Sequence, residues 1–300
     1  MSGTVGEIDI IKTHWTEPLT LQVRHLTRFV YDGPADYNYN EVRLRPFRDH
    51  SQNCQSYQLH VAPPTQIRSF PDFYGNCVDY VDVMAQHMQL EIEALSVVLT
   101  HQDDRGPVPR DISPELLKDS RIQELEYQFL HGSSYVSLDA EIWRQEKQAL
   151  PSAMLDLWGN AMAIGRHIHD TFDYTPQVTS VNTHPAEVLE TRKGVCQDFA
   201  HVMLGMCRIQ GIPARYVSGY FFNPQRAPDE LEASHAWVEV FLPGYGWKGF
   251  DPTHNRVPDT RYVKVAVGRD YADAVPISGR FRGRGRQSMV VEAKVTRLAG

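Results

Sequence analysis

The spacing of apolar residues changes near residue 103, and this change restricts the possible folds more than any other feature of the chain. From Leu19 to about Thr100, β-branched, aromatic and alternating residues predict short strands. Turn sequences separate these strands at Asp32-Gly33-Pro34, Pro63-Pro64 and Gly75-Asn76. After a polar segment at 103–111, apolar residues recur at helical spacing. The sequence therefore predicts an α+β chain whose strand-rich part comes first.

The second part of the chain combines helices with further strands. Helical patterns cover 114–130, 138–150, 154–172 and a segment that begins at Cys196, and strand patterns cover 214–222, 236–242, 247–251 and 288–298. We expect five parts: an N-terminal extension (1–18), an N-terminal β-sandwich-like domain (19–102), a helical linker region (103–150), a catalytic core (151–265) and C-terminal strands that return to the β domain (266–300).

Composition and charge narrow the classes of partner. Of the 300 residues, 42% are hydrophobic and 22% are charged, as in ordinary globular proteins. The net charge of −7 and the pI near 6.0 weigh against nucleic acid and anionic membranes as partners. No run of 18 apolar residues predicts a membrane span. Peptidic or neutral substrates fit this composition better, and nothing in the sequence sets the oligomeric state.

The cysteines and the N-terminus indicate a compartment. Four cysteines, at positions 54, 77, 196 and 207, show no paired spacing, so we expect reduced thiols rather than a disulfide framework. Residues 1–14 lack the apolar centre of a secretory signal. Together these features predict a cytoplasmic protein.

The run Thr-Arg-Lys-Gly-Val-Cys-Gln-Asp-Phe-Ala-His, residues 191–201, places Cys196 at the start of a predicted helix. Free N–H groups and the positive end of the helix dipole at that position favour a thiolate over a thiol. Cys196 is therefore the candidate nucleophile. Cys207 lies about 16 Å further along the same helix, and we expect it to belong to the core.

Two downstream motifs supply the partners that a thiol nucleophile needs. Ser-His-Ala-Trp-Val-Glu-Val carries His235 on a predicted strand, and Trp-Lys-Gly-Phe-Asp-Pro-Thr carries Asp251 at the end of the next one. A histidine can take the thiol proton, and a carboxylate on its other ring nitrogen fixes the tautomer and stabilises the imidazolium. Trp237 shares the strand face of His235 and can border a substrate cleft or belong to the core.

The pairing register of these two strands decides whether His235 and Asp251 meet. Pairing Phe241 with Tyr245 puts them directly opposite each other, and pairing Phe241 with Trp247 makes them diagonal neighbours. A register shifted by one residue turns one strand over and separates them.

Structural roles are the plainer interpretation of each residue alone, because free cysteines are commonly buried and Asp-Pro commonly forms turns. Their occurrence together, in order and with a workable register, favours chemistry. Zinc bound by Cys196, His201, His235 and His254 is the main chemical alternative. However, His201 lies roughly 500° around the helix from Cys196, and no Cys-x-x-Cys or His-Glu-x-x-His motif is present. We expect no metal and no cofactor.

Three charged features have no assigned part in this chemistry. Asp198 fits the dipole of the first helical turn, and its side chain is expected to point away from the thiol. Arg215 is expected to pair with a surface acid. Residues 280–286, with four arginines and two glycines, predict a loop or hairpin between exposed strands, or alternatively a site for an anionic ligand.

Four segments of the sequence resemble the bacterial transglutaminase-like proteins. They are Gly194-Val-Cys-Gln-Asp-Phe-Ala-His201, Gly211-Ile-Pro-Ala-Arg-Tyr-Val-Ser-Gly-Tyr220, His235-Ala-Trp-Val-Glu-Val240 and Gly246-Trp-Lys-Gly-Phe-Asp-Pro-Thr253. The specific match covers about residues 185–255, and the N-terminal strands and the Asp270–Pro276 stretch resemble the family's flanking parts more loosely.

This resemblance implies a fold and a set of roles. The fold is a papain-like α+β core with the cysteine on a helix packed against an antiparallel sheet. Cys196 matches the family nucleophile, His235 its general base and acid, and Asp251 its orienting carboxylate. The family includes crosslinking amine transferases, peptidases, amidases and members without activity. Hydrolysis of a peptide or isopeptide amide is our first expectation, and amine transfer to a glutamine and a non-catalytic binding module are the alternatives.

Overall fold

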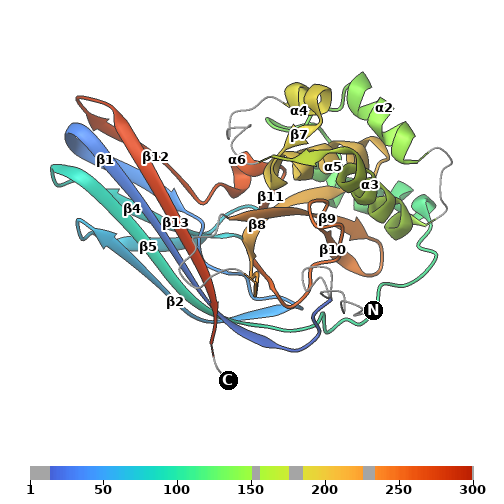
Figure 1. The fold of residues 1–300 in the computed structure, drawn as a ribbon, viewed down its shortest axis with the longest axis horizontal. Helices are drawn as coiled ribbons and strands as arrows, with labels where there is room; N and C mark the ends of the chain where they lie inside the picture. Colours follow the sequence, from blue (N-terminus) through green and yellow to red (C-terminus); the bar gives the residue numbers. More distant parts are fainter. Residues whose placement is uncertain (1–13, 151–155, 176–184, 226–233, 299–300) are drawn as a thin grey trace, which may run out of the picture.

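The computed structural model describes residues 14–150, 156–175, 185–225 and 234–298, and most of the predicted N-terminal extension, residues 1–13, lies outside this range. Two antiparallel sheets organise the molecule. Figure 1 shows the N-terminal sheet on one side of the molecule, and a second sheet covered by helices on the other. This arrangement is the expected α+β class.

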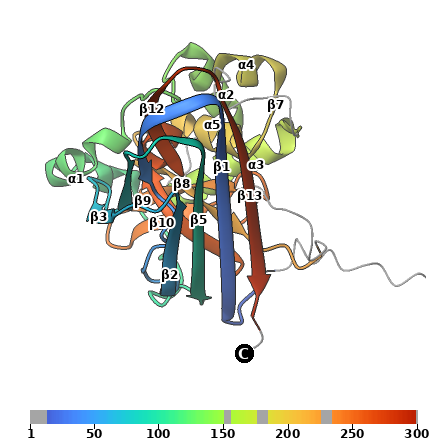
Figure 2. The same cartoon turned by 90° about the vertical axis from the view of Figure 1, so that its left-hand side faces the viewer.

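The N-terminal sheet is built around one long strand. Its strands are β1 (Leu19–Val42), β2 (Gln52–Ala62), β3 (Ile67–Pro71), β4 (Cys77–Val83), β5 (His87–Thr100), β12 (Ile277–Gly283) and β13 (Gln287–Arg297). β1 pairs with β5 and β4 along one side and with β13 and β12 along the other. Figure 2 shows β2, β5, β1 and β13 side by side. The C-terminal strands thus pair with the first strand of the chain.

A single curled sheet stands in place of the two sheets that a sandwich would have. The reason lies in the segment Asp32-Gly33-Pro34, which the sequence predicts to be a turn. There β1 continues through an irregularity, because its pairing with β5 shifts register between Val30 and Ala35. The sheet bends at this point and encloses apolar side chains such as Phe29, Leu90 and Ile92.

The helical region is more broken than its periodicity predicts. The pattern over 114–130 forms three short pieces: the 3-10 helices η1 (Pro114–Lys118) and η2 (Tyr127–Phe129), with α1 (Ser120–Leu125) between them. Asp119 ends the first piece and caps the next, because its carboxylate accepts the Arg121 N–H. The other helices are α2 (Ala140–Ala149), α3 (Leu157–Thr171), α4 (Pro185–Thr191), α5 (Cys196–Ile209) and α6 (Tyr271–Ala274).

The second sheet has the strand order β10-β9-β8-β11. Its strands are β8 (Ala214–Phe221), β9 (His235–Leu242), β10 (Gly246–Phe250) and β11 (Tyr262–Gly268), and the short strands β6 (Asp173–Tyr174) and β7 (Lys193–Gly194) pair separately beside it. No helix among the described residues is long and apolar enough to span a membrane.

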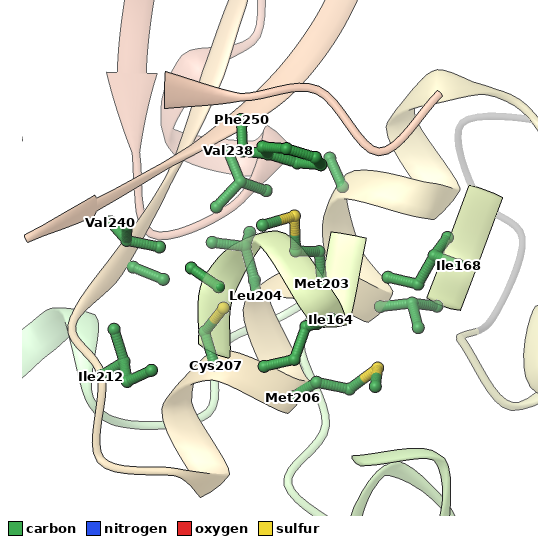
Figure 3. Packing of buried hydrophobic residues seen from close by; sticks show 14 of the residues in the cluster. Ile164, Ile168, Met203, Leu204, Met206, Cys207, Ile212, Val238, Val240 and Phe250 are labelled. Atoms are coloured by element: carbon green, nitrogen blue, oxygen red, sulfur yellow. The ribbon is translucent and has the colours of Figure 1, made fainter. Parts of the chain in front are cut away.

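Helix α5 lies at the centre of the hydrophobic core that the helices form with the second sheet. Val238 and Val240 of β9 pack against it on one side, and Ile164 and Ile168 of α3 pack on the other, as Figure 3 shows. Gly165 permits close approach of α3 to the sheet, since a Cβ there would lie 2.3 Å from the Phe250 ring. The buried helix therefore fixes the position of its first residue relative to the ends of the neighbouring strands.

Candidate active site

Cys196 is the first residue of α5, as its sequence context predicts. Its side chain is partly buried against the core and partly open to solvent. Asp198, two residues on, turns its carboxylate back to accept the Val195 N–H at 2.8 Å. This bond stabilises the first turn of the helix and occupies the Asp198 carboxylate with the backbone.

The strand register brings His235 and Asp251 together. Phe241 pairs with Trp247, which is the diagonal one of the two productive registers. His235 opens β9 and Asp251 directly follows β10, so both lie at the same end of the sheet. His235 Nε2 and Asp251 Oδ2 are 2.7 Å apart. The Cys196 side chain lies near enough to His235 to contribute to the raised pKa of its imidazole.

Asp251 accepts hydrogen bonds from several directions. Its Oδ2 accepts from Nδ1 of His254 and from the hydroxyl of Tyr262, each at 2.7 Å, in addition to His235. Its Oδ1 accepts the backbone N–H of Thr253 at 2.8 Å. The residue is fully buried, so these donors replace the water that the carboxylate loses. The carboxylate is thereby held in one orientation towards His235.

Interactions within this cluster favour the charged forms of both His235 and Asp251. Burial lowers the pKa of His235, but the charge and hydrogen bond of Asp251, together with the nearby Cys196, outweigh this effect and raise the pKa to about 10. Burial raises the pKa of Asp251, and the charge and hydrogen bonds of His235 and His254 reverse that effect and hold it well below its usual range. At neutral pH the pair is therefore an imidazolium and a carboxylate.

Burial and the nearby Asp251 charge hold the pKa of Tyr262 well above its usual range. Tyr262 thus stays protonated and donates to the carboxylate. Neither it nor His254 was identified from the sequence as a partner of Asp251. For His254, the spacing Asp251-Pro-Thr-His254 is a usable signal, because a tight turn after a strand returns residue i+3 to residue i. Tyr262 belongs to a strand at the opposite edge of the sheet, and no local pattern reveals it.

Trp237 lies beneath the histidine. Its ring stacks on that of His235, with centroids 6.1 Å apart, and meets Tyr262 edge-on. Only 2% of Trp237 is exposed, so packing accounts for most of its surface. The residue also borders a cavity of about 730 Å³ between the two sheets. Its role in substrate binding stays a prediction.

A buried charge network lines the same cavity. Arg215 was expected to pair with a surface acid, but its partner is the buried Glu239, which lies directly opposite it on β9. Arg215 donates two bonds to Glu239, at 2.6 and 2.8 Å, and Lys264 donates another at 2.8 Å. The two cations hold the pKa of Glu239 near 2, against the upward effect of burial. This network stabilises the face of β9 that also carries His235.

Metal binding has one geometric candidate among the described residues. His235, Asp251 and His254 offer donor atoms within 4.8 Å of one another. All three are already linked by hydrogen bonds through Asp251 Oδ2. His201, a member of the zinc set weighed from the sequence, is occupied elsewhere: it stacks on Tyr135 and accepts the Tyr271 N–H. The donors thus satisfy one another as a hydrogen-bonded group.

The other cysteines lack the surroundings of a nucleophile. Cys207 is fully buried in the core, as expected, and burial raises the pKa of its thiol to about 12. Burial also raises the pKa of Cys54 and Cys77, which lie in the N-terminal sheet. All four cysteines are free thiols. Cys196 alone among them lies beside a histidine that pairs with a carboxylate.

Comparison with known proteins identifies the family to which the chain belongs. The sequence profile of the transglutaminase-like superfamily matches residues 146–252, and that of the bacterial transglutaminase-like N-terminal region matches residues 21–99. An uncharacterised protein of Mycobacterium leprae is 32% identical over 283 residues, which make up 93% of this chain and 99% of that protein.

Two further proteins share parts of this similarity. A protein-glutamine gamma-glutamyltransferase of Pseudomonas aeruginosa is 33% identical over 170 residues, or 51% of this chain and 24% of that protein. A solved structure of a cysteine protease candidate from Cytophaga hutchinsonii has a TM-score of 0.74 at 24% identity, covers 95% of this chain and 92% of its own, and shows the same fold. The chain belongs to the transglutaminase-like superfamily and combines its core with an N-terminal sheet domain of the bacterial type.

Proposed function

We propose that the protein is a cysteine-dependent acyl-transfer enzyme that hydrolyses a peptide or isopeptide amide. The observation on which this proposal rests is that Cys196, at the start of α5, lies near His235, which is hydrogen-bonded to Asp251 at 2.7 Å. This arrangement places a partly exposed thiol at a helix start near an imidazole whose pKa is about 10. An imidazolium next to a thiol favours the thiolate, which is the nucleophilic form.

The first half of the reaction forms an acyl-enzyme. The Cys196 thiolate attacks the amide carbonyl carbon, and the carbonyl oxygen becomes an oxyanion. His235 then gives its proton to the departing nitrogen as the C–N bond breaks, which leaves a thioester on Cys196 and a free amine. Asp251 keeps the imidazole ring oriented and compensates its charge while it is protonated.

The second half returns the enzyme to its starting state. Neutral His235 takes a proton from water, whose oxygen attacks the thioester carbon. The C–S bond breaks, the acid product leaves, and the thiolate–imidazolium pair is restored. Because the Cys196 side chain is partly open to solvent, water can reach this position.

The start of helix α5 provides one candidate donor for the oxyanion. The backbone N–H of Cys196 lies in the first turn of α5, where N–H groups have no partner within the helix. Such a group can donate to the developing negative oxygen, and the dipole of α5 adds to its effect.

Alkylation kinetics provide the test of the thiolate. Iodoacetamide should label Cys196 in the wild type rapidly at neutral pH, and the His235→Ala variant should be labelled at least about tenfold more slowly. The His201→Ala variant is the matched control, because His201 lies on the same helix but contacts Tyr135 and Tyr271 instead. Equal labelling rates in wild type and His235→Ala would contradict the proposed pair.

A substrate screen tests the reaction itself. A library of peptides and isopeptide amides should yield free amine with the wild type and none with Cys196→Ala. If no substrate is turned over although Cys196 is reactive, a non-catalytic binding role for the same fold gains support.

Amine transfer is the second candidate, favoured by the similarity to the Pseudomonas aeruginosa glutamyltransferase. In that reaction a lysine amine, rather than water, attacks the thioester. A fluorescent primary amine should then be incorporated into a glutamine-containing protein. Ammonia release in buffer without added amine measures hydrolysis. If amine incorporation is faster than this release, transfer rather than hydrolysis is the main activity.

A further inference from the structure

A cavity of about 730 Å³ lies between the two sheets, on the face of β9 that carries Trp237 and Glu239. The residues that alternate with them pack against α5 on the opposite face of this strand. The cavity walls include residues of the segments 14–16, 49–52, 101–107, 245–249 and 257–260. Neither Cys196 nor His235 lines the cavity. It is therefore separate from the candidate nucleophile, and its volume falls within the range of about 300–1,000 Å³ that is typical of small-molecule sites.

The charged side chains around this cavity are paired within the protein. The pairs are Lys264 with Asp49 and Glu239, Arg215 with Glu239, Arg105 and Lys248 with Asp103, and Arg261 with Asp259. Carboxylates and Lys or Arg side chains are equal in number in the lining, so at neutral pH the cavity carries no net charge that attracts ions. The paired groups keep hydrogen-bonding capacity, because a carboxylate has about four acceptor sites and an ammonium group has about three donors. Donors and acceptors therefore lie close together around the cavity.

Aromatic side chains form much of the remaining wall. They are Trp15, Trp237, Tyr245, Trp247 and Tyr262. Only 2% of Trp237 is exposed, and its indole N–H has no hydrogen-bond acceptor among the described residues. A Cβ at Gly249, another residue of the wall, would lie 3.5 Å from this nitrogen, so the N–H lies at the surface of the cavity. A buried N–H without an acceptor is rare in folded proteins, and a molecule in the cavity can supply one.

We propose that the cavity binds a short neutral carbohydrate. The C–H groups of a pyranose ring form flat apolar faces that suit aromatic side chains, and its hydroxyl groups both donate and accept hydrogen bonds. A hydroxyl oxygen of the sugar would accept from the Trp237 indole N–H. An anion fits less well, because each lining Lys or Arg already has a carboxylate partner. A purely apolar molecule would separate the polar groups of the wall from water without replacing their hydrogen bonds.

Tryptophan signals in nuclear magnetic resonance test the proposal. Trp15, Trp237 and Trp247 line the cavity, whereas Trp143 on α2 and Trp158 on α3 do not. In the full-length protein labelled with nitrogen-15 at tryptophan, each indole N–H gives its own signal, and tryptophan-to-phenylalanine variants assign these signals. The probes are cellobiose, maltose, lactose and chitobiose, each titrated to about 10 mM. We expect at least one of them to shift the Trp237 signal to saturation, while the signals of Trp143 and Trp158 stay in place.

Two control ligands test the chemistry of the site. Triethylene glycol has oxygen acceptors but no rigid ring face, and the uronic acid analogue of the bound disaccharide adds a negative charge. Both should bind at least about tenfold more weakly than the neutral disaccharide, because one lacks the apolar faces and the other brings a charge that finds no free cation.

A pair of variants locates the sugar. Trp237→Phe keeps an aromatic ring and removes the indole N–H, so it should weaken disaccharide binding about fivefold or more, as followed by the Trp15 and Trp247 signals. Trp143→Phe is the matched control, because Trp143 is exposed on α2, and it should bind the sugar as the wild type does. Circular dichroism and thermal melting confirm that each variant is folded.

Alkylated protein separates this site from the candidate active site. Binding in the cavity is independent of the proposed reaction, because it requires neither a reactive thiol nor a cleavable amide. Protein alkylated at Cys196 with iodoacetamide should therefore bind the disaccharide with unchanged affinity.

Four results would each overturn the proposal. The first is that none of the disaccharides shifts the Trp237 signal. The second is that triethylene glycol shifts it at the same concentration, because the cavity would then admit any small polar solute. The third is that Trp237→Phe binds the sugar as tightly as the wild type. The fourth is that alkylation of Cys196 abolishes binding, which would place the sugar at the thiol instead.

Discussion

The two sheets of this protein are both antiparallel, but they are buried in different ways. The N-terminal sheet buries one face, and in β2 buried or half-buried residues alternate with exposed ones for much of the strand. In the second sheet, six consecutive residues of β9 are buried, because α5 covers one face and aromatic and charged side chains cover the other. The same strand geometry therefore produces two very different environments.

This difference determines what each sheet can do. The ion pair that Glu239 of β9 forms with Arg215 is buried away from water. Its interaction is therefore strong, and removal of one partner should cost much of the stability of the fold. The pairs on the outer face of the N-terminal sheet, such as Arg28 with Glu91, remain in contact with solvent and are screened. The buried sheet therefore holds its charged groups in fixed positions, whereas the ion pairs of the N-terminal sheet stay accessible to solvent.

The largest effect should follow from removal of the nucleophile. Cys196→Ala should lower the amidase activity by more than about a thousandfold, while the free energy of unfolding changes by less than about 1 kcal/mol, because the thiol is only partly buried. Cys207→Ala, on the same helix, should show the reverse: near-normal activity and a loss of about 1 kcal/mol of stability. Steady-state kinetics and urea unfolding measure both quantities. Similar activities in the two variants would contradict the assignment.

The next largest effect concerns the orienting carboxylate. Asp251→Asn keeps the shape of the side chain but removes its charge, and we expect activity to fall by about a hundredfold or more. The pKa of His235 is raised to about 10 chiefly by Asp251. The alkaline limb of the kcat/KM profile should therefore move to lower pH in the variant, because His235 loses its proton earlier. An unchanged alkaline limb would show that Asp251 does not set the protonation of His235.

The same variant has a signature in stability. The folded-state pKa of His235 lies above its unfolded value, so its contribution is fully present below about pH 6.5 and is lost as pH rises through about 10. The wild type should thus be more stable than Asp251→Asn at neutral pH, and the difference should shrink above pH 10. Urea unfolding at several pH values measures it.

Sequence patterns predicted the second sheet well where the constraint was local. The helix that begins at Cys196 and the possible registers for His235 and Asp251 follow from periodicity and loop length alone. The choice between the direct and diagonal registers did not, because both keep the two residues on one face. The burial of Glu239 was also missed, since its sequence position gives no sign that a second domain covers that face of β9.

The N-terminal sheet shows the opposite limitation. Its strands were recognisable from alternation, and the C-terminal strands return to it as expected, but the continuous course of β1 and the single curled sheet were not predicted. Asp32-Gly33-Pro34 has the composition of a hairpin turn, yet β1 continues past it because partner strands hold it from both sides. Such pairing joins residues more than 200 positions apart, and local propensity contains no information about it.

A buried charge in β9 should matter more for stability than a solvent-exposed one in the N-terminal sheet. Glu239→Gln would leave Arg215 and Lys264 without their shared carboxylate, and we expect a loss of about 3 kcal/mol in the free energy of unfolding. Glu91→Gln removes the partner of Arg28 at a solvent-exposed position and should change stability little. Because the pKa of Glu239 is lowered to about 2, its contribution is present above about pH 4.5 and is lost towards pH 2. Equal losses in the two variants would remove the contrast between the sheets.

The smallest expected effect distinguishes a residue that positions the Asp251 carboxylate from one that only stabilises the fold. Tyr262→Phe and Tyr57→Phe each remove one hydroxyl that donates to a buried aspartate, Asp251 at 2.7 Å and Asp79 at 2.6 Å. Both variants should lose about 1.5–3 kcal/mol of stability, the contribution of a hydrogen bond to a charged group. Only Tyr262→Phe should also lower kcat, by up to about tenfold with KM unchanged, because only that hydroxyl holds the carboxylate that orients His235. If Tyr57→Phe lowered kcat equally, loss of stability rather than positioning would explain both effects, and Tyr262 would have no special relation to the site.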